Sequence, residues 1–337
     1  MCVLLCVGLC SCADSGIFYE PQDHISFNYN NISTGNTAYW IDTDAVYYQQ
    51  HDLLFNVYMI KEDGQRKLTS AAGVGELQVY NGKLYFLDLE KDTEKFVLCE
   101  YDVNAGKKKE VVAFEAETVL GYYLLENRMY VVTRGNGELK ENVKVVLLET
   151  NAVEDVASDT FACGVFDGKF AYVAATDGVY NAYQYDGLNN ETTLIGSFEI
   201  SLGVSETLCD AVSFTSDAIL FAVNDEANMR SRLLVYNISD ALLEEYAVNG
   251  YVNNAVAYNE YAFVSVTEKL YSDSNLQNNK VYRFCIESFE YSEIAELDGI
   301  LSMFMTSDDD VYISSTAFEG IVHYSSGGEK EDVLRYE

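Results

Sequence analysis

DAVYYQQHDLLFNVYMIKEDGQRKLT, residues 44–69, contains the features that decide the fold of this chain. Asp44 precedes an apolar and aromatic run, and a second alternating run ends near Tyr58. Alternation of this kind, rich in Val and Tyr, is typical of β-strands with a buried face. Asp63-Gly64 follows, a pair that adopts the positive backbone angles of a tight hairpin. The stretch therefore predicts three antiparallel strands joined by a loop and a turn.

Degraded copies of this stretch recur along the chain. In each copy a turn residue precedes an apolar or aromatic pair in the second strand, and an aromatic or apolar residue ends the third. The second-strand anchors lie 38 to 49 residues apart, with a mean of about 44: Tyr47, Tyr85, Tyr130, Ala171, Leu220, Phe263 and Tyr312. The third-strand markers are Tyr58, Tyr101, Leu148, Tyr185, Tyr236, Phe284 and Tyr324. Both markers give the same seven units, and the period is that of four-stranded propeller blades.

The repeat predicts an all-β fold, a seven-bladed β-propeller of four-stranded antiparallel blades, with eight or six blades as alternatives. One small twisted sheet cannot bury both its faces, whereas radially stacked sheets cover one another. A single propeller domain is expected over residues 36–337, with the first strand of each unit along the central channel. Whether residues 25–32 add a strand to the last blade is left open. The expected channel strands are Thr37–Thr43, Glu76–Tyr80, Val119–Leu124, Phe161–Phe166, Asp210–Phe214, Val252–Tyr258 and Gly299–Phe304.

The chain is strongly acidic, with 54 Asp and Glu against 21 Lys and Arg and a net charge of −33. This field repels phosphate backbones, so nucleic-acid binding is excluded, and it disfavours docking on anionic lipid headgroups. The simplest interpretation is solubility together with protection of outer sheet edges. A cationic partner or divalent ions are the alternative.

The N-terminus resembles an export signal. Residues 3–9 (VLLCVGL) are apolar but shorter than the roughly 20 residues that span a membrane. Small and apolar residues then lead to Cys12, which is expected to be the lipidated cysteine of a bacterial lipoprotein, with Cys10 as second choice. The basic segment that usually opens such a signal is missing, since no Lys or Arg precedes Lys61. A buried N-terminal strand is the alternative.

Residues 1–12 are accordingly interpreted as a lipoprotein-type signal segment and 13–35 as a polar lead-in, to which Ile25–Tyr29 adds one strand. Attachment of two or more acyl chains gives a stable anchor. The protein is therefore expected outside the cytoplasm, on the outer face of the cell membrane, and bound to it only through this anchor.

Residues 47–69 also carry a family resemblance. A Tyr-Tyr strand is followed by Val-Tyr, a basic residue, Asp-Gly and a closing Lys-Leu-Thr. This order resembles the repeat of the low-density-lipoprotein-receptor-related-protein-like β-propeller domains of unknown function, found in lipoproteins of Gram-positive anaerobes. The resemblance is good over one blade and faint over the others. It implies a propeller fold and a cell-surface location, and it assigns no catalytic residues.

Catalytic chemistry has few candidates. Glycoside hydrolysis uses two facing carboxylates about 5–9 Å apart, and the expected inner strands offer Asp42, Glu76 and Asp210. A hydrolase or lyase with a carboxylate pair at the channel mouth is thus the alternative function. The three histidines, His24, His51 and His323, lack the spacing of metal ligands. No metal and no cofactor is predicted, and Ser307–Asp310 is interpreted as a hairpin turn rather than a Ca²⁺ site.

The loops of the sixth unit are the candidate ligand site. Asn249–Asn254 leads into an expected channel strand, and a long polar loop, residues 267–279, follows in the same unit. Asn supplies adaptable hydrogen bonding and Tyr rigid aromatic area, so Tyr251, Asn253 and Asn254 are the candidate ligand-binding residues. Cys99, Cys163, Cys209 and Cys285 are expected to be free thiols. The predicted function is a monomeric, non-catalytic binding or scaffold module that recognises an envelope protein or a glycan.

Overall fold

The computed structural model describes most of the chain, as a series of segments. The described residues are 17–19, 39–41, 45–50, 56–70, 77–90, 95–115, 117–135, 140–209, 212–225, 227–267, 278–315 and 320–336. Within these segments every regular element is a β-strand, as the sequence predicts. Nor do they include a helix of the length and apolar character needed to cross a membrane.

The first two sheets and the last two each contain four consecutive strands. The first sheet holds β2 (Tyr39–Ile41), β3 (Val46–Gln50), β4 (Asn56–Lys61) and β5 (Gly64–Ser70). The second holds β6 (Gln78–Tyr80), β7 (Lys83–Glu90), β8 (Lys95–Asp102) and β9 (Lys107–Phe114). Near the C-terminus follow β22 (Tyr251–Tyr258), β23 (Tyr261–Thr267), β24 (Asn278–Cys285) and β25 (Tyr291–Asp298). The last sheet contains β26 (Ile300–Ser307), β27 (Asp310–Ser315), β28 (Gly320–Ser325) and β29 (Lys330–Tyr336).

The two sheets between them are less regular. The longer one holds β10 (Glu117–Leu125), β11 (Arg128–Gly135), β12 (Glu141–Leu147), β13 (Ala152–Phe166), β14 (Lys169–Thr176), β15 (Val179–Asp186) and β16 (Glu191–Glu199). The other holds β17 (Glu206–Leu208), β18 (Ser213–Phe214), β19 (Ala218–Asp225), β20 (Arg230–Asn237) and β21 (Leu242–Asn249).

Three features of these sheets depart from a simple four-strand repeat. The 15-residue strand β13 pairs with β12 through its first half and with β14 through its second, and so joins two four-strand units into one seven-stranded sheet. The short strands β17 and β18 both pair with β19. Finally β1 (Ile17–Tyr19), from the segment interpreted as a polar lead-in, pairs antiparallel with β29. Residues 25–32 lie outside the described segments.

Two of the predicted turns form as expected, whereas between β4 and β5 the turn residues are Glu62 and Asp63, and of the predicted Asp63-Gly64 pair only Gly64 has a positive φ, 125°. Asn81 and Gly82, between β6 and β7, have φ of 52° and 70°, and Asp167 and Gly168, between β13 and β14, have 48° and 71°. Two successive positive φ angles are what a type I′ hairpin turn requires, and Asn, Asp and Gly adopt them at low cost. These turns fix the register in which each second strand returns along the first.

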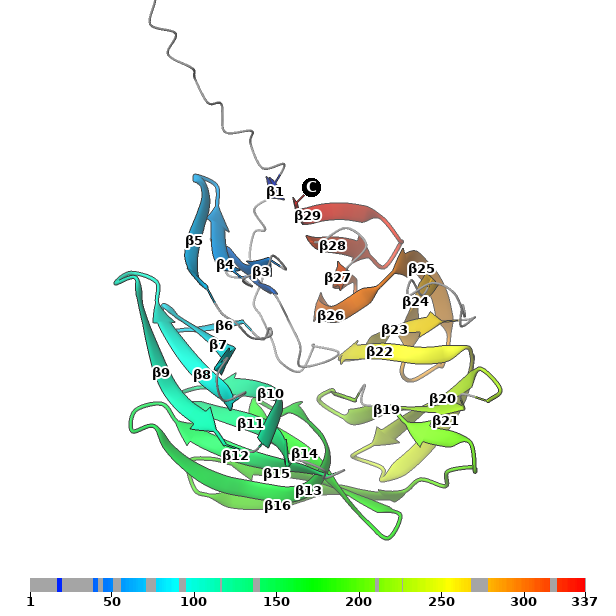
Figure 1. Ribbon diagram of the computed structural model, residues 1–337. Coiled ribbons are helices and arrows are strands. Elements are labelled where there is room, and N and C mark those ends of the chain that lie inside the picture. Colours follow the sequence, from blue (N-terminus) through cyan, green and yellow to red (C-terminus); the bar gives the residue numbers. More distant parts are fainter. Residues whose placement is uncertain are drawn as a thin grey trace, which may run out of the picture.

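The sheets stand side by side around a common centre (Figure 1). Each interface is an apolar cluster that takes residues from two neighbouring sheets. The first and last sheets also meet: Val46, Tyr48 and Ile60 pack with Phe304 and Tyr312. The ring therefore closes through side-chain packing between the two ends of the chain, and β1 lies beside the C-terminal strand (Figure 1).

Buried amide side chains connect neighbouring sheets near the centre. The Gln78 amide donates to the Tyr122 carbonyl (2.8 Å) and accepts from the Leu124 N–H (3.0 Å). Asn224 does the same with Val252, donating to its carbonyl (2.9 Å) and accepting from its N–H (3.1 Å). Each amide thus acts as a one-residue strand partner for the next sheet and pairs with both backbone groups of a residue, or of neighbouring residues, at the sheet interface.

Candidate functional site

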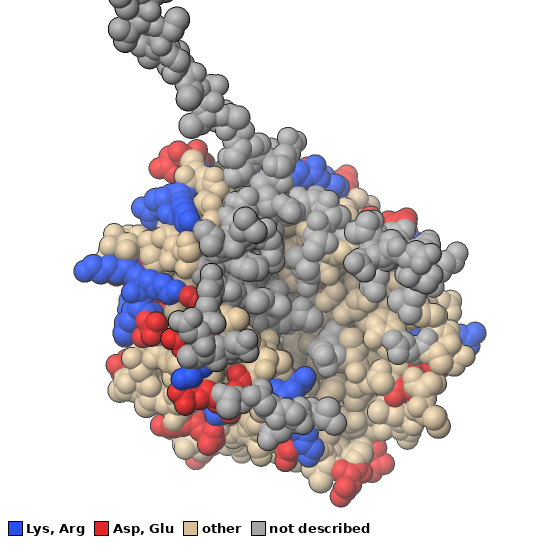
Figure 2. Space-filling view, in the orientation of Figure 1, with Lys and Arg blue, Asp and Glu red and all other residues tan. Residues whose placement is uncertain are grey.

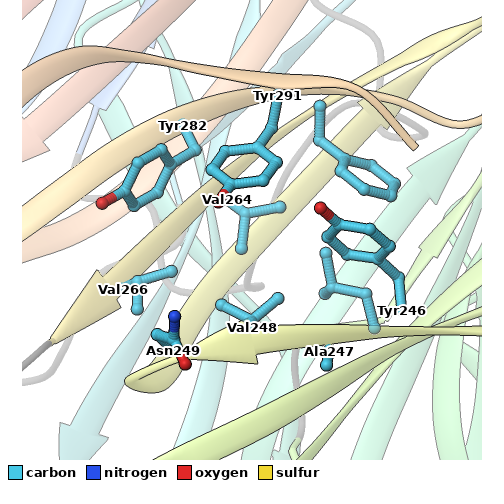
Figure 3. Close-up of a pocket in the computed structure, with 10 residues that line it drawn as sticks. Tyr246, Ala247, Val248, Asn249, Val264, Val266, Tyr282 and Tyr291 are labelled. Atoms are coloured by element: carbon cyan, nitrogen blue, oxygen red, sulfur yellow. The ribbon is translucent and has the colours of Figure 1, made fainter. Parts of the chain in front are cut away.

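A pocket of about 130 Å³ opens between β21 and the sheet of β22–β25. Its walls are aromatic and aliphatic (Figure 3): Tyr282, Tyr291 and Val266 come from the sheet of β22–β25, and Val248 and Asn249 come from β21 on the facing side. Tyr246 reaches in from β21, with Leu233, Ala247, Val264 and Phe284 completing the lining. Asp, Glu, Lys, Arg, His and Cys are absent from this lining. Such a pocket is suited to binding, and its lining lacks the side chains that most often transfer protons in catalysis.

The aromatic side chains support one another. The Tyr246 ring lies 5.3 Å from Phe284, 5.6 Å from Phe289 in a stacked arrangement and 6.0 Å from Tyr291. The Tyr282 and Tyr291 rings meet edge to face at 5.6 Å. Contacts of this geometry hold aromatic rings in fixed orientations. The pocket walls are therefore organised in the absence of a ligand.

The local strand geometry explains why these rings gather here. A register shift between β24 and β25 at Val281 and Tyr282 is a β-bulge, which changes the direction of nearby side chains. Tyr291 begins β25, the outermost strand of its sheet, and 56% of its surface remains exposed. Tyr246 occupies β21, the outermost strand of the preceding sheet. The pocket thus lies at the rim of the ring, where two outer strands face each other across a sheet interface.

The pocket also presents polar groups that the protein leaves unused. Within the described segments, the hydroxyls of Tyr246 and Tyr291 and the amide of Asn249 make no hydrogen bond with other residues. Burial raises the pKa of Tyr246, and the neighbouring Tyr291 raises it further. The Tyr246 phenol therefore stays protonated at neutral pH and can act as a hydrogen-bond donor.

The three candidate ligand-binding residues lie on the strand next to this pocket. Asn253 is the unpaired residue of a bulge in β22, and its amide donates to Thr267 Oγ1 (2.7 Å) and Asn279 Oδ1 (2.9 Å). Asn254 is 6% exposed, and Tyr251 is half-buried. The structure brings Asn253 together with both ends of the loop predicted to accompany it. Its amide hydrogens are engaged within the protein, and a ligand role for these residues stays a prediction.

Other residues singled out by the sequence fall into two groups. Cys12, Asp42, Glu76 and Asp210 lie outside the described segments, so the anchor and the carboxylate pair stay predictions. The four cysteines of the propeller body are free thiols, as predicted. Burial raises the pKa of Cys99 to about 11, which keeps that thiol protonated and unreactive.

The acidic side chains of the Ser307–Asp310 turn are paired with nearby side chains of the protein. Asp310 accepts hydrogen bonds from Ser307 (2.5 Å) and from His323 (2.9 Å), and Arg283 pairs with Asp309 (3.2 Å). Burial opposes ionisation of Asp310, but the hydrogen bonds from Ser307 and His323 outweigh it and lower the pKa. No group of three or more His, Cys, Asp or Glu positioned to hold a metal occurs among the described residues.

Sequence reasoning missed the pocket itself. Tyr246, Tyr282 and Tyr291 were not among the residues expected to bind a ligand. One signal was present: Tyr246 and Tyr291 belong to the fourth strands of their units, the strands that carry mostly polar and charged residues elsewhere in the chain. A large aromatic residue on such a strand is a better marker of a binding surface than one on an inner strand.

Comparisons with known proteins support the fold. No protein-family model matches the chain, and no curated protein matches it. The β-propeller domain of the Trilobed protease from Pyrococcus furiosus is similar in structure, with a TM-score of 0.59 and 12% identity over 93% of this chain and 98% of that one. The tricorn protease gives 0.59 and 12% identity over 94% of this chain, which spans only 35% of that protein.

An oligogalacturonate lyase from Vibrio parahaemolyticus gives a TM-score of 0.52 and 11% identity over 88% of this chain and 89% of that one. At these identities the likeness concerns the fold alone. The chain is an all-β protein with a β-propeller architecture, and its function has to be argued from its own residues.

Proposed function

We propose that this protein is a non-catalytic binding module that recognises a protein or carbohydrate ligand of the cell envelope at the pocket between β21 and β25. The observation that carries the proposal is the pocket lining. Aromatic walls combined with a few unused polar groups are typical of ligand sites, whereas acid–base catalysis most often uses His, Asp, Glu, Lys or Cys, none of which lines this pocket.

We also propose that the ring has seven four-stranded blades. Cutting the seven-stranded sheet within β13 turns it into two four-stranded units that share this strand. Each of the other sheets supplies one unit. In this count β17 and β18 together form the inner strand of their blade, and β1 is an additional strand of the last blade. The contact between first and last sheets supports a closed ring of these units.

The proposed location is the outer face of the cell membrane, with Cys12 as the acylated residue. Its support comes from the sequence: the apolar run before Cys12 and the resemblance to repeats of bacterial lipoproteins. Only four residues separate Cys12 from Ile17, the first residue of β1. At about 3.5 Å per extended residue, such an anchor would hold the edge of the last blade within roughly 20 Å of the bilayer.

The experiment that tests the binding function measures retention of the soluble propeller on insoluble envelope material from the source organism. Tyr291→Ala removes the most exposed wall of the pocket, and Leu188→Ala, in the turn between β15 and β16, is the matched control because Leu188 is 69% exposed and remote from the pocket. The proposal predicts saturable retention that falls with Tyr291→Ala and is unchanged with Leu188→Ala. Equal retention of all three proteins would contradict it.

A further inference from the structure

We propose that the pocket between β21 and β25 accommodates one neutral sugar ring of an envelope glycan. This inference rests on the proposed binding function and narrows its ligand class. It follows from three properties of the pocket: its opposed walls, its unused hydrogen-bonding groups and its lack of charge.

The walls are suited to a flat ring that is apolar on its faces. One wall comes from the sheet of β22–β25 and contains Tyr282, Tyr291 and Val266, and the facing wall comes from β21 and contains Tyr246 and Val248 (Figure 3). The C–H faces of a pyranose can pack against an aromatic ring on one side and aliphatic groups on the other. The volume of about 130 Å³ is close to that of a protein cavity, roughly 150 Å³, that holds one six-membered ring. The pocket therefore has room for a single ring and not for a longer segment.

The polar groups distinguish a sugar from an apolar side chain of a protein partner. The hydroxyls of Tyr246 and Tyr291 and the Asn249 amide have no hydrogen-bond partner in the described part of the chain. Sugar hydroxyls both donate and accept, and can pair with all three. An inserted Leu or Phe side chain would cover these groups without pairing them, which is costly for buried polar atoms. The chemistry of the lining thus favours a polyhydroxylated ring.

The charges select neutral sugars. The lining contains no cation to neutralise a carboxylate or a phosphate. The basic side chains that gather over β5 and β9 lie on another part of the rim (Figure 2). On the pocket's own sheet, Lys280 is already paired with Glu293 at 3.2 Å. With a net charge of −33, the chain as a whole repels acidic glycans.

Isothermal titration calorimetry of the propeller with soluble neutral oligosaccharides tests the inference. A panel of xylo-, cello-, malto- and chito-oligosaccharides covers the common ring stereochemistries, and choline chloride serves as a cationic probe, because aromatic rings also bind ammonium groups. We expect saturable binding of at least one oligosaccharide. Tyr291→Ala should weaken it by about tenfold or more, the loss of one stacking surface and one hydrogen bond.

Two further variants measure how much the Tyr291 hydroxyl and the Asn249 amide each contribute to the affinity. Tyr291→Phe keeps the ring and removes the hydroxyl, and Asn249→Ala removes the amide; each is expected to weaken binding about threefold to tenfold. Leu188→Ala should leave the affinity unchanged. Because Tyr291 and Asn249 are exposed, these variants are expected to fold, which circular dichroism checks.

The inference is overturned if no neutral oligosaccharide binds saturably, if Tyr291→Ala keeps affinity within twofold, or if choline binds more tightly than every sugar. The envelope-retention assay then tells two failures apart. Retention that depends on Tyr291 but is not competed by any oligosaccharide overturns the sugar inference and leaves the binding function standing. Absence of retention overturns both.

Discussion

Asn224→Ala tests how neighbouring sheets are held together beside the pocket. Asn224 is fully buried, and its amide makes three hydrogen bonds: to the carbonyl of Val252 (2.9 Å), from the N–H of Val252 (3.1 Å) and from Ser231 Oγ (2.6 Å). A net contribution of about 1 kcal/mol for each of the three bonds gives a loss of about 3 kcal/mol in the free energy of unfolding. Alanine has no group that replaces any of these bonds.

Urea unfolding followed by circular dichroism measures this loss, with linear extrapolation to water. Asn228→Ala is the matched control, because Asn228 is exposed and, among the described residues, its side-chain amide bonds to Asp225 at the end of the same hairpin. The control should change the free energy of unfolding by less than about 1 kcal/mol. A loss below about 1 kcal/mol for Asn224→Ala, or one equal to that of the control, would refute the proposed role of the amide.

Three further predictions concern other parts of the chain. Asp310→Asn removes a carboxyl whose pKa is lowered in the folded protein, so the wild type should be more stable than the variant at neutral pH. Urea unfolding measures this difference in stability. The difference should disappear as the pH falls below about 4 and the wild-type carboxylate becomes protonated. Gly320→Ala would place a Cβ 2.0 Å from the backbone oxygen of Leu334 and should lower the free energy of unfolding by about 1–3 kcal/mol. Gly327→Ala, where the nearest neighbouring atom is 3.8 Å from the new Cβ, should not lower it. Thermal unfolding compares the two variants. Cys12→Ser, in a version of the protein with its full leader, should move the protein from the membrane to the soluble fraction, and unchanged fractionation would refute the anchor.

The sequence predicted the architecture because propeller blades are built from local patterns. Turn pairs such as Asn81-Gly82 and Asp167-Gly168 form the hairpins expected of them. The anchors Tyr85 and Phe263 are buried on second strands, as their spacing implied. Alternation and turn chemistry depend on adjacent residues, so one sequence contains the information needed to place these strands.

Features that depend on distant residues were not predictable in the same way. Strand β13 belongs to two units because no turn or loop interrupts it near Asp159, where its pairing changes from β12 to β14. Pairing of Ile17–Tyr19 with β29 joins opposite ends of the sequence. No local pattern identifies such partners: β1 is a short apolar segment, and β29 has the charged sequence of an ordinary outer strand.

The candidate site was only partly located from sequence. Asn249 lines the pocket, and the loops next to it were the expected binding region. Asn253 was chosen for its amide, yet a bulge turns that amide toward Thr267 and Asn279. The pocket walls come from β20, β21, β23, β24 and β25. The spacing between the walls is set by how two sheets pack, which residue order alone does not give.

The charge distribution also refines the sequence interpretation. Nine of the 21 Lys and Arg residues lie between Lys61 and Lys109. They include Lys107 and Lys109 on β9. Figure 2 shows basic side chains gathered over β5 and β9. The net charge describes the average field around the protein, whereas individual parts of its rim differ in sign. This difference matters for interactions within the roughly 8 Å over which physiological salt screens charges.

Hydrogen–deuterium exchange with and without solubilised envelope material tests most directly where the protein binds. Binding at the proposed pocket predicts slower exchange in residues 242–249 and 278–298, the segments that contain Tyr246, Tyr282 and Tyr291. Slower exchange confined to the expected inner strands around Glu76 and Asp210, with the pocket segments unchanged, would contradict the account and favour a site at the channel mouth.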